Sequence, residues 1–434
     1  MMSDFLTLPE GPFTLENATL FDPSQPNGLS TGSVSVADGH IVDGSKGADT
    51  GPAIDAKGGI VLPTFVDMHT HLDKGHIWGR APNPDGTFMG ALTTVGEDRV
   101  ANWSAEDVRA RMNFSLKCAY AHGTSTVRTH LDSLPPQDSI SWPVFRELRE
   151  EWAGRVALQA ACLVPIDMVE NEGGFLGTAN IVAESGGTLG AVTYPMPDLA
   201  QRLETFFAMA TERGLDADFH ADETGDPSVA TLRTIAETVL KTGFDAPVTV
   251  GHCCSLAVQD ESEADRTLDL VAEAGLNIVS LPLCNLYLQA RNPGTTPRWR
   301  GVTLVHEMRK RGINVSFASD NTRDPFYAYG DLDMVEVLRE STRIAHLDHT
   351  KPHWFDAFCA NPAKACGLSK SDLSVGSKAD FIIFKARSMT EFLARPQSDR
   401  IVVREGKAID RTLPDYAELD HLMTQTKEAQ RMSA

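Results

Sequence analysis

Between Gly59 and about Asp320, short apolar runs alternate with segments of helical period, and this pattern strongly constrains the fold. Strands of a buried parallel sheet read as short apolar runs, and the helices that return the chain carry a 3.6-residue period. Eight strand candidates end near His71, His130, Leu163, Tyr194, His220, His252, Leu283 and Asp320. Eight strand–helix units predict an α/β protein built on a (β/α)8 TIM barrel.

The segments between these runs carry helix signals. Helical period occurs over residues 104–122, 198–214, 227–243 and 260–275. Ser104 is a candidate N-cap with Asp107 three residues on, and Gly123 is placed to end that helix. An open doubly wound sheet is the alternative fold, but no G-x-G-x-x-G loop follows the first strand.

Both ends of the chain have β-type sequence. Residues 11–62 contain short strand-like runs separated by Pro, Gly, Asn and Asp, and residues 379–384 and 399–404 are good strand candidates. We therefore predict a small β-sandwich from residues 1–62 and 368–410, a barrel over residues 63–367, and a polar helix or tail over residues 411–434.

Charge and cysteine usage limit the partners and the compartment. A net charge of −20 argues against nucleic acid and against an anionic membrane surface as partners. No apolar run is as long as a membrane span, and no basic region precedes an apolar run near residue 1, so we expect neither a transmembrane span nor a signal peptide. Seven cysteines without a C-x-x-C pair predict reduced thiols and a cytoplasmic location. We also expect a homo-oligomer.

The first apolar run ends in His69-Thr-His71. Residues i and i+2 of a strand point to the same side, so these two imidazoles face one way. Barrel enzymes gather their active groups at the carboxyl ends of the strands, where His220 and Asp320 also fall. We therefore predict that His69, His71, His220 and Asp320 bind one divalent metal ion, Zn²⁺ or Fe²⁺.

Such an ion can lower the pKa of its water from about 15.7 to about 7 and so supply a hydroxide nucleophile. The fourth run, Gly190–Tyr194, holds no lysine for a carbamylated bridge, which favours one ion over two. Glu223 follows His220 by three residues and can carry a proton from the water to a ring nitrogen. His252 ends the sixth run, where it can orient or polarise the water.

Other interpretations of these residues stay open. Glu223 could be a solvated loop carboxylate or a first-turn acid of a helix, and His252 a buried histidine satisfied by backbone groups. His130 is interpreted as a structural residue or a support for the metal ligands. The roles of Lys74, His76 and the adjacent Cys253 and Cys254 are not assigned, since loop exposure explains the first two and barrel packing the thiols.

The set of an H-x-H motif, two later histidines and an Asp on the eighth strand resembles the amidohydrolase superfamily, and bacterial cytosine deaminases most closely. The matching stretches are His69-Thr-His-Leu-Asp73, Val127-Arg-Thr-His130, His220-Ala-Asp-Glu223, Leu281–Gln289, Arg300–Thr303, Ser319–Gly330 and Gly376–Phe384. The resemblance covers residues 55–410. The motif at 220–223, together with those at 281–289 and 319–330, is highly specific.

The resemblance implies that Glu223 is the proton shuttle and that His252 and Asp320 activate the water. It also implies that Gln159 on the third strand grips a carbonyl and a ring N–H of the substrate, because a carboxamide offers a donor and an acceptor.

The chain departs from the cytosine deaminase pattern at two expected substrate-binding positions. Asn321 stands where a second Asp normally follows the metal Asp, and Phe326 stands where a Trp is expected. Asn keeps hydrogen bonding but loses a charge, and Phe offers a smaller stacking face. Both changes leave the hydrolytic chemistry intact and put the identity of the base in doubt.

We therefore predict a metal-dependent hydrolytic deaminase. It converts an amino-substituted heterocycle, cytosine or a related pyrimidine, purine or pterin-like base, to the oxo product and ammonia, so its partners are a small heterocycle and water. The first alternative is cleavage of a cyclic amide, or removal of an alkylamine from a triazine, on the same scaffold. A non-catalytic metal- or ligand-binding protein is the second alternative, and it would require loss of a ligand or of the proton shuttle.

Overall fold

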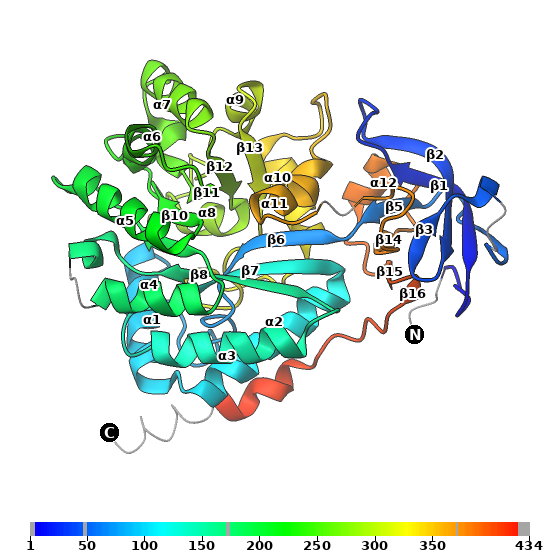
Figure 1. Ribbon diagram of the computed structural model, residues 1–434, viewed down its shortest axis with the longest axis horizontal. Helices are drawn as coiled ribbons and strands as arrows, with labels where there is room; N and C mark the ends of the chain where they lie inside the picture. Colours follow the sequence, from blue (N-terminus) through cyan, green and yellow to red (C-terminus); the bar gives the residue numbers. More distant parts are fainter. Residues whose placement is uncertain (1–4, 47–49, 171–173, 370–371, 424–434) are drawn as a thin grey trace.

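The computed structural model describes residues 5–46, 50–170, 174–369 and 372–423. These residues form an α/β fold with one mixed sheet and two parallel sheets (Figure 1). The parallel sheets and the intervening helices confirm the α/β class predicted from the alternating pattern. Within the described residues, no helix is both long enough and apolar enough to cross a membrane.

The mixed sheet draws its strands from both ends of the chain. Its strands are β1 (Phe13–Phe21), β2 (Leu29–Ala37), β3 (His40–Val42), β4 (Ala53–Asp55), β5 (Ile60–Pro63), β14 (Phe381–Ile383), β15 (Ile401–Arg404) and β16 (Lys407–Ala408). The two ends meet where β5 pairs with β14, with Leu62 opposite Ile382. Residues 13–21 form one continuous strand, β1, whose pairing with β2 shifts between Leu15 and Ala18.

The parallel strands are β6 (Phe65–Thr70), β7 (Thr124–Asp132), β8 (Ala157–Leu163), β9 (Leu189–Val192), β10 (Ala217–Ala221), β11 (Val248–His252), β12 (Asn277–Ser280) and β13 (Asn314–Phe317). The first three form one sheet, and β9 to β13 form the other in sequence order. Isolated parallel bridges connect the two sheets on both sides. Ala161 pairs with Thr188, and Thr70 of β6 pairs with Asp320 just beyond β13.

The helices are α1 (Phe88–Asn102), α2 (Ala105–His122), α3 (Asp138–Glu151), α4 (Gly174–Glu184), α5 (Leu199–Arg213), α6 (Thr231–Thr242), α7 (Glu261–Glu273), α8 (Pro282–Leu288), α9 (Val305–Lys310), α10 (Met334–Ala345), α11 (Ala360–Ala365) and α12 (Met389–Ala394). The predicted caps of α2 are confirmed, since Ser104 accepts from the Asp107 N–H and Gly123 adopts the left-handed φ of 97°.

Two predicted strand ends differ from the structure. The seventh strand ends at Ser280 rather than near Leu283, and Pro282 begins the helix α8. Proline fits the first turn of a helix because its missing N–H would have no intrahelical partner there. The eighth strand ends at Phe317, so Asp320 lies in the loop that follows it. Within the predicted helix or tail, residues 416–423 form a short helical segment, and residues 424–434 lie outside the described residues.

Candidate active site

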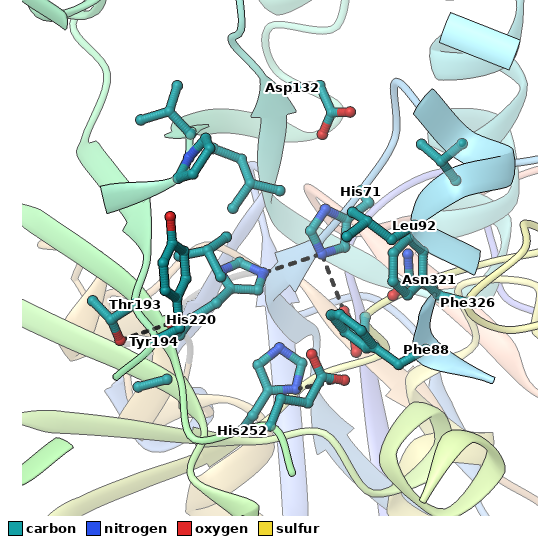
Figure 2. Close-up of a pocket in the computed structure, with 18 of the residues that line it drawn as sticks. His71, Phe88, Leu92, Asp132, Thr193, Tyr194, His220, His252, Asn321 and Phe326 are labelled. Atoms are coloured by element: carbon teal, nitrogen blue, oxygen red, sulfur yellow. Dashed lines mark hydrogen bonds and ion pairs between the residues drawn. The ribbon is translucent and has the colours of Figure 1, made fainter. Parts of the chain in front are cut away.

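The four predicted metal ligands meet at the carboxyl ends of β6, β10 and β13, and all four are buried. The Nε2 atom of His220 lies 3.1 Å from Nε2 of His69 and 3.4 Å from Nε2 of His71. The Oδ1 atom of Asp320 lies 3.2 Å from Nε2 of His71 and 3.6 Å from Nε2 of His69. Figure 2 shows His71 and His220 side by side, with their ring nitrogens facing.

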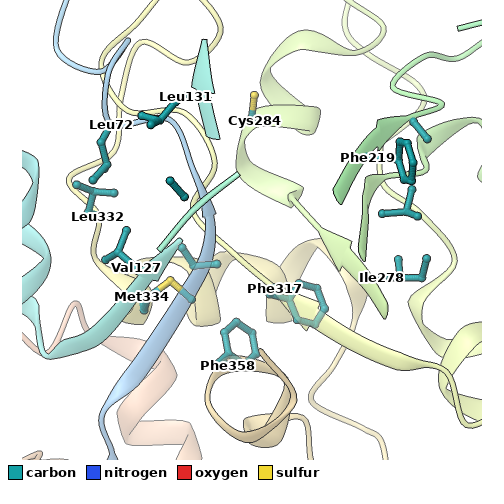
Figure 3. Close-up of a cluster of buried hydrophobic side chains, with 14 of the residues drawn as sticks. Leu72, Val127, Leu131, Phe219, Ile278, Cys284, Phe317, Leu332, Met334 and Phe358 are labelled. Atoms are coloured by element: carbon teal, nitrogen blue, oxygen red, sulfur yellow. The ribbon is translucent and has the colours of Figure 1, made fainter. Parts of the chain in front are cut away.

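Strand alternation turns His220 away from the packed core. Phe219 points from β10 into the packed core, which Figure 3 shows together with Phe317 and Phe358, while His220 points to the opposite side. Phe317 stacks on Phe358 with a ring-centroid distance of 5.0 Å. Burial of a phenylalanine side chain stabilises the fold by roughly 1.5–3 kcal/mol, so the same strands that hold the core also fix the imidazoles.

The donor set fits a divalent cation. Two overlapping groups of side chains each place their ligand atoms within 4.8 Å of one another. The first group is His69, His71, His130 and His220, and the second is His69, His252 and Asp320. Among the described residues, no nitrogen or oxygen donor forms a hydrogen bond to either carboxylate oxygen of Asp320, and the thiol of Cys284 is at most a weak donor to it. A buried carboxylate without a donor is costly, and a cation held between it and the imidazoles would remove that cost.

Burial sets the protonation of these groups. It is the largest cause that holds the pKa of His69, His71 and His220 well below the usual range, so the imidazoles are neutral and their lone pairs are available. Burial also raises the pKa of Asp320 to about 7. His252 and Asp320 adopt left-handed backbone φ values of 69° and 65°, which are unfavourable outside glycine and are often found at functional sites.

Glu223 and His252 lie beside this cluster. Nδ2 of Asn285 donates to Oε1 of Glu223 at 3.2 Å and to Nδ1 of His252 at 3.0 Å. Nε2 of Gln289 donates to the Glu223 carbonyl at 3.1 Å. The Glu223 side chain is only 14% exposed. Burial, followed by the charge of Asp320, raises its pKa well above the usual range. Glu223 is therefore a buried cavity residue fixed by Asn285 and Gln289, and not a solvated loop carboxylate.

A cavity of about 590 Å³ opens above the cluster. Its wall includes Phe88, Leu92, Val95, Gly96 and Arg99 of α1, then Val164, Pro165, Val192, Thr193 and Tyr194, together with His71, His220, Glu223, His252 and Asp320. Asn321 and Phe326, the two residues at which the sequence departs from the cytosine deaminase pattern, also line it. The rings of Phe326 and Phe88 meet edge to face with centroids 5.4 Å apart.

The structure does not bring Gln159, the residue expected to grip the substrate, to the cavity wall. Its Oε1 accepts hydrogen bonds from Nε and Nη2 of Arg128 at 3.1 and 2.9 Å, and its Nε2 donates to the Cys366 carbonyl at 3.0 Å. Gln159 lies near the start of β8, whereas the cavity is lined by residues from Leu163 onward. Both ends of the carboxamide are thus occupied, away from the cavity.

The structure buries four residues whose roles the sequence left open: His130, His76, Cys253 and Cys254. His130 packs on His69 with ring centroids 4.0 Å apart, and its Nε2 lies 2.9 Å from Oδ1 of Asp218. His76 packs against Phe114 instead of lining the cavity. The thiols of Cys253 and Cys254 are also buried, and burial raises the pKa of each well above the usual range, so neither is a ready nucleophile.

The cavity wall also holds three charged residues to which the sequence analysis gave no role, Lys74, Asp132 and Arg99. Nζ of Lys74 lies 3.1 Å from Oδ1 of Asp132, and Nη1 of Arg99 donates to Oδ2 of Asp132 at 3.0 Å. Asp132 follows His130 by two residues, the same spacing as His69 and His71, so strand alternation could have indicated it. No comparable signal marks Arg99, because its helix was not predicted.

Comparison with known proteins gives consistent results. The model of the amidohydrolase family matches residues 53–135 and 171–410. The pterin deaminase of Rhizobium rhizogenes strain K84 is 54% identical over 420 residues, which cover 94% of this chain and 96% of that protein. The crystal structure of 5-methylcytosine deaminase from Klebsiella pneumoniae, liganded with 5-fluorocytosine, superposes with a TM-score of 0.77 at 26% identity and covers 93% of this chain and 98% of that one.

A more distant structure shares the fold. It is an adenosine deaminase from Xanthomonas campestris with bound zinc, which superposes with a TM-score of 0.68 at 16% identity over 97% of this chain and 99% of that one.

Proposed function

This chain belongs to the amidohydrolase family, and we propose that it is a metal-dependent hydrolase that removes the amino group of a pterin. The 54% identity to a pterin deaminase over nearly the whole of both chains carries the proposal. The cavity volume of about 590 Å³ supports it, because such a volume lies well within the range of about 300–1,000 Å³ for drug-sized ligands. It leaves room for a two-ring heterocycle.

We propose that His69, His71, His220 and Asp320 hold one Zn²⁺ or Fe²⁺ ion. Neutral imidazoles and a carboxylate form a mixed nitrogen and oxygen set that suits either metal. His130 is less suited to direct ligation because its Nε2 already faces Asp218. When bound, the ion supplies the nucleophile by lowering the pKa of a water molecule to about 7.

The residues of the chain carry the proton steps and orient the reactants. The overall reaction adds water to the ring carbon that bears the amine, protonates a ring nitrogen, and expels ammonia to leave a carbonyl. Glu223, whose pKa is raised by burial, is suited to accept the proton from water and pass it to that ring nitrogen. Asn285 keeps the Glu223 carboxylate beside His252.

His252 is suited to donate a hydrogen bond. Because Asn285 donates to Nδ1, the proton of the neutral ring resides on Nε2, which has no partner among the described residues. Burial lowers the pKa of His252 to about 3, which keeps the ring neutral. An N–H donor at this position can orient the attacking water. Phe326 and Phe88 offer apolar faces to a flat ring, and Asn321 offers a carboxamide.

We also propose a (β/α)8 barrel, a small β-sandwich and a cytoplasmic location for this protein. The bridges of Thr70 with Asp320 and of Ala161 with Thr188 support closure of β6–β13 into a (β/α)8 barrel over residues 63–367. The mixed sheet supports a small β-sandwich built from residues 1–62 and 368–410. All seven cysteines are free and buried, which agrees with a reducing cytoplasm. The homo-oligomer stays a prediction.

Ammonia release tests the function directly. Zn²⁺- and Fe²⁺-loaded enzyme is given a pterin, cytosine, guanine and an N-alkylaminotriazine, and ammonia and the oxo product are quantified. We expect the highest kcat/KM with the pterin and one ammonia for each oxo product. Preferred turnover of cytosine would exclude the pterin assignment, release of alkylamine would favour the triazine reaction, and no turnover at all would favour a binding protein. Glu223→Gln is the matched inactive control.

A further inference from the structure

Residues 289–301 form a surface loop whose two ends lie against each other. Gln289 is the C-cap of α8, and Gly301, with a left-handed φ of 73°, closes the loop against it. A methyl group added at Gly301 would lie 2.5 Å from Cβ of Gln289 and 2.8 Å from the Asn285 carbonyl oxygen. Glycine suits both this close approach and the positive φ, so the return of the loop is fixed at the end of α8.

One aromatic side chain of this loop packs back on the barrel. Residues 291–298 and Arg300 are exposed, whereas Trp299 is half-buried. Nη1 of Arg300 donates to a backbone carbonyl of α10 at 2.7 Å, so the chain is held on both sides of the tryptophan. The ring of Trp299 covers Gly225, where an added methyl group would lie 2.6 Å from Cζ3 and 3.1 Å from Cε3. Trp299 therefore packs directly on the backbone two residues beyond Glu223.

The segment that carries Glu223 is anchored differently on its two sides. Oδ1 of Asp222, just before it, accepts hydrogen bonds from both the N–H and the Oγ1 of Thr231, each at 2.7 Å, at the start of α6. The turn that follows, residues 224–228, makes hydrogen bonds within itself and back to Asp222. The ring of Trp299 supplies the packing contact that ties this turn to another part of the barrel mouth.

The same loop also holds Glu223 through Gln289. Nε2 of Gln289 donates to the Glu223 carbonyl at 3.1 Å, and Nδ2 of Asn285, one turn earlier, donates to the Glu223 carboxylate at 3.2 Å. The backbone is thus held at Glu223 and again at Gly225. A carboxylate that must reach both water and a ring nitrogen depends on this backbone, because a misplacement of about 1 Å can lower a rate about 10²-fold.

We propose that Trp299 is a positioning residue for proton transfer, because its ring, seated on Gly225, fixes the backbone that carries Glu223. This inference rests on the proposed function, in which Glu223 moves the proton. The described residues that line the cavity do not include Trp299, so its effect reaches the substrate through the Glu223 segment. The expected signature is a loss of kcat with little change in KM or in bound metal.

Two variants disturb the contact from opposite sides. Trp299→Ala removes the ring, and Gly225→Ala adds a methyl group that displaces it, at a backbone φ outside the left-handed region. We expect each variant to lose about 10–100-fold in kcat for a pterin, with KM and bound zinc close to wild type. Trp299→Phe keeps a packing ring and should recover most of the activity. The controls are Thr296→Ala, exposed in the same loop, and Gly177→Ala, which has open space around it in α4.

A double-mutant cycle separates this contact from general destabilisation. Gly225→Ala should lower kcat by less than about twofold in the Trp299→Ala background, because no ring remains to be displaced. Trp299→Ala should likewise lower kcat by less than about twofold once Glu223→Gln has removed the proton carrier. Independent structural losses would multiply instead.

Each failure has a distinct meaning. If Trp299→Ala keeps kcat within about threefold of wild type, raises KM alone or loses its zinc, or if the losses multiply in either cycle, the positioning role is wrong and the proposed function stands. If wild type deaminates another heterocycle and not the pterin, the pterin assignment is wrong, and the same cycles on that heterocycle decide whether Trp299 positions Glu223. Failure to release ammonia from any heterocycle overturns both.

Discussion

Asn321 donates a hydrogen bond from Nδ2 to Oδ2 of Asp324 over 2.8 Å. The other carboxylate oxygen of Asp324 accepts from the backbone N–H of Phe326 at 2.8 Å. The carboxylate therefore ties the residue that follows Asp320 to the turn that presents the Phe326 ring. The amide at position 321 has a structural partner in addition to any substrate it contacts.

Asn321→Asp should make activity strongly dependent on pH. The substitution replaces a donor with a second carboxylate beside Asp324, whose pKa burial already raises to about 6. Two adjacent buried carboxylates cannot both ionise without repulsion, so the pair must share a proton. We expect kcat/KM to fall about tenfold or more at pH 8 relative to wild type, with partial recovery below pH 6. A pH–rate profile parallel to that of wild type would contradict the inference that residue 321 and Asp324 share a proton in the variant.

Glu223→Gln should retain the metal and lose turnover. Glutamine keeps the size of the side chain and can still meet Asn285, but it cannot carry the proton, and general acid–base groups contribute about 10²–10⁴-fold. The measurements are ammonia release and metal content by elemental analysis. Glu237→Gln changes an exposed residue of α6 and serves as the control. Turnover within tenfold of wild type would remove Glu223 from the proton path.

Local periodicity in the sequence predicted much of the framework. Alternation along a strand is a short-range property, so it indicated parallel strands and the common direction of His69 and His71. His220 lies 149 residues beyond His71, and their approach could be anticipated only through the barrel topology that we predicted. The structure brings these residues together, and their roles as ligands stay predictions.

The sequence could not predict how far along a strand a residue lies relative to the cavity, or the path of a long loop. Gln159 has a suitable side chain but lies near the wrong end of β8, because alternation fixes the side of a sheet and not the height. The helix α1, which brings Arg99 to the cavity, follows a loop whose path depends on tertiary contacts. One such contact is the bond from the His76 N–H to the Thr322 carbonyl at 3.0 Å.

Removal of the metal should destabilise the protein as well as inactivate it. Without a cation, the buried Asp320 carboxylate has no nitrogen or oxygen donor among the described residues, and burial raises its pKa to about 7. We expect chelation to lower the thermal unfolding midpoint by several degrees and to abolish ammonia release, with recovery of both on addition of Zn²⁺ or Fe²⁺. His220→Ala should bind less than one equivalent of metal. A full equivalent retained by that variant would exclude His220 as a ligand.

Acid stability should depend on Asp333 and Arg400. Arg400 binds both oxygens of Asp333 at 2.7 and 2.6 Å, at the start of α10. Burial alone would raise the pKa of Asp333, but Arg400 outweighs burial and lowers it to about 2. A carboxyl whose pKa falls on folding contributes stability above its unfolded value of 3.8, and that contribution is lost as pH falls towards 2. The shift corresponds to roughly 2 kcal/mol.

We therefore expect Asp333→Asn to be less stable than wild type by at least about 2 kcal/mol at pH 7, because the buried Arg400 loses its counter-charge. The difference should shrink by roughly 2 kcal/mol near pH 2, where Asp333 of the wild type is itself becoming protonated. Denaturant unfolding of both proteins at pH 7, 4 and 2 measures it. Asp245→Asn, at an exposed position, controls for the loss of one negative charge. An equal difference between the two proteins at all three pH values would show that charge pairing with Arg400 does not stabilise the fold.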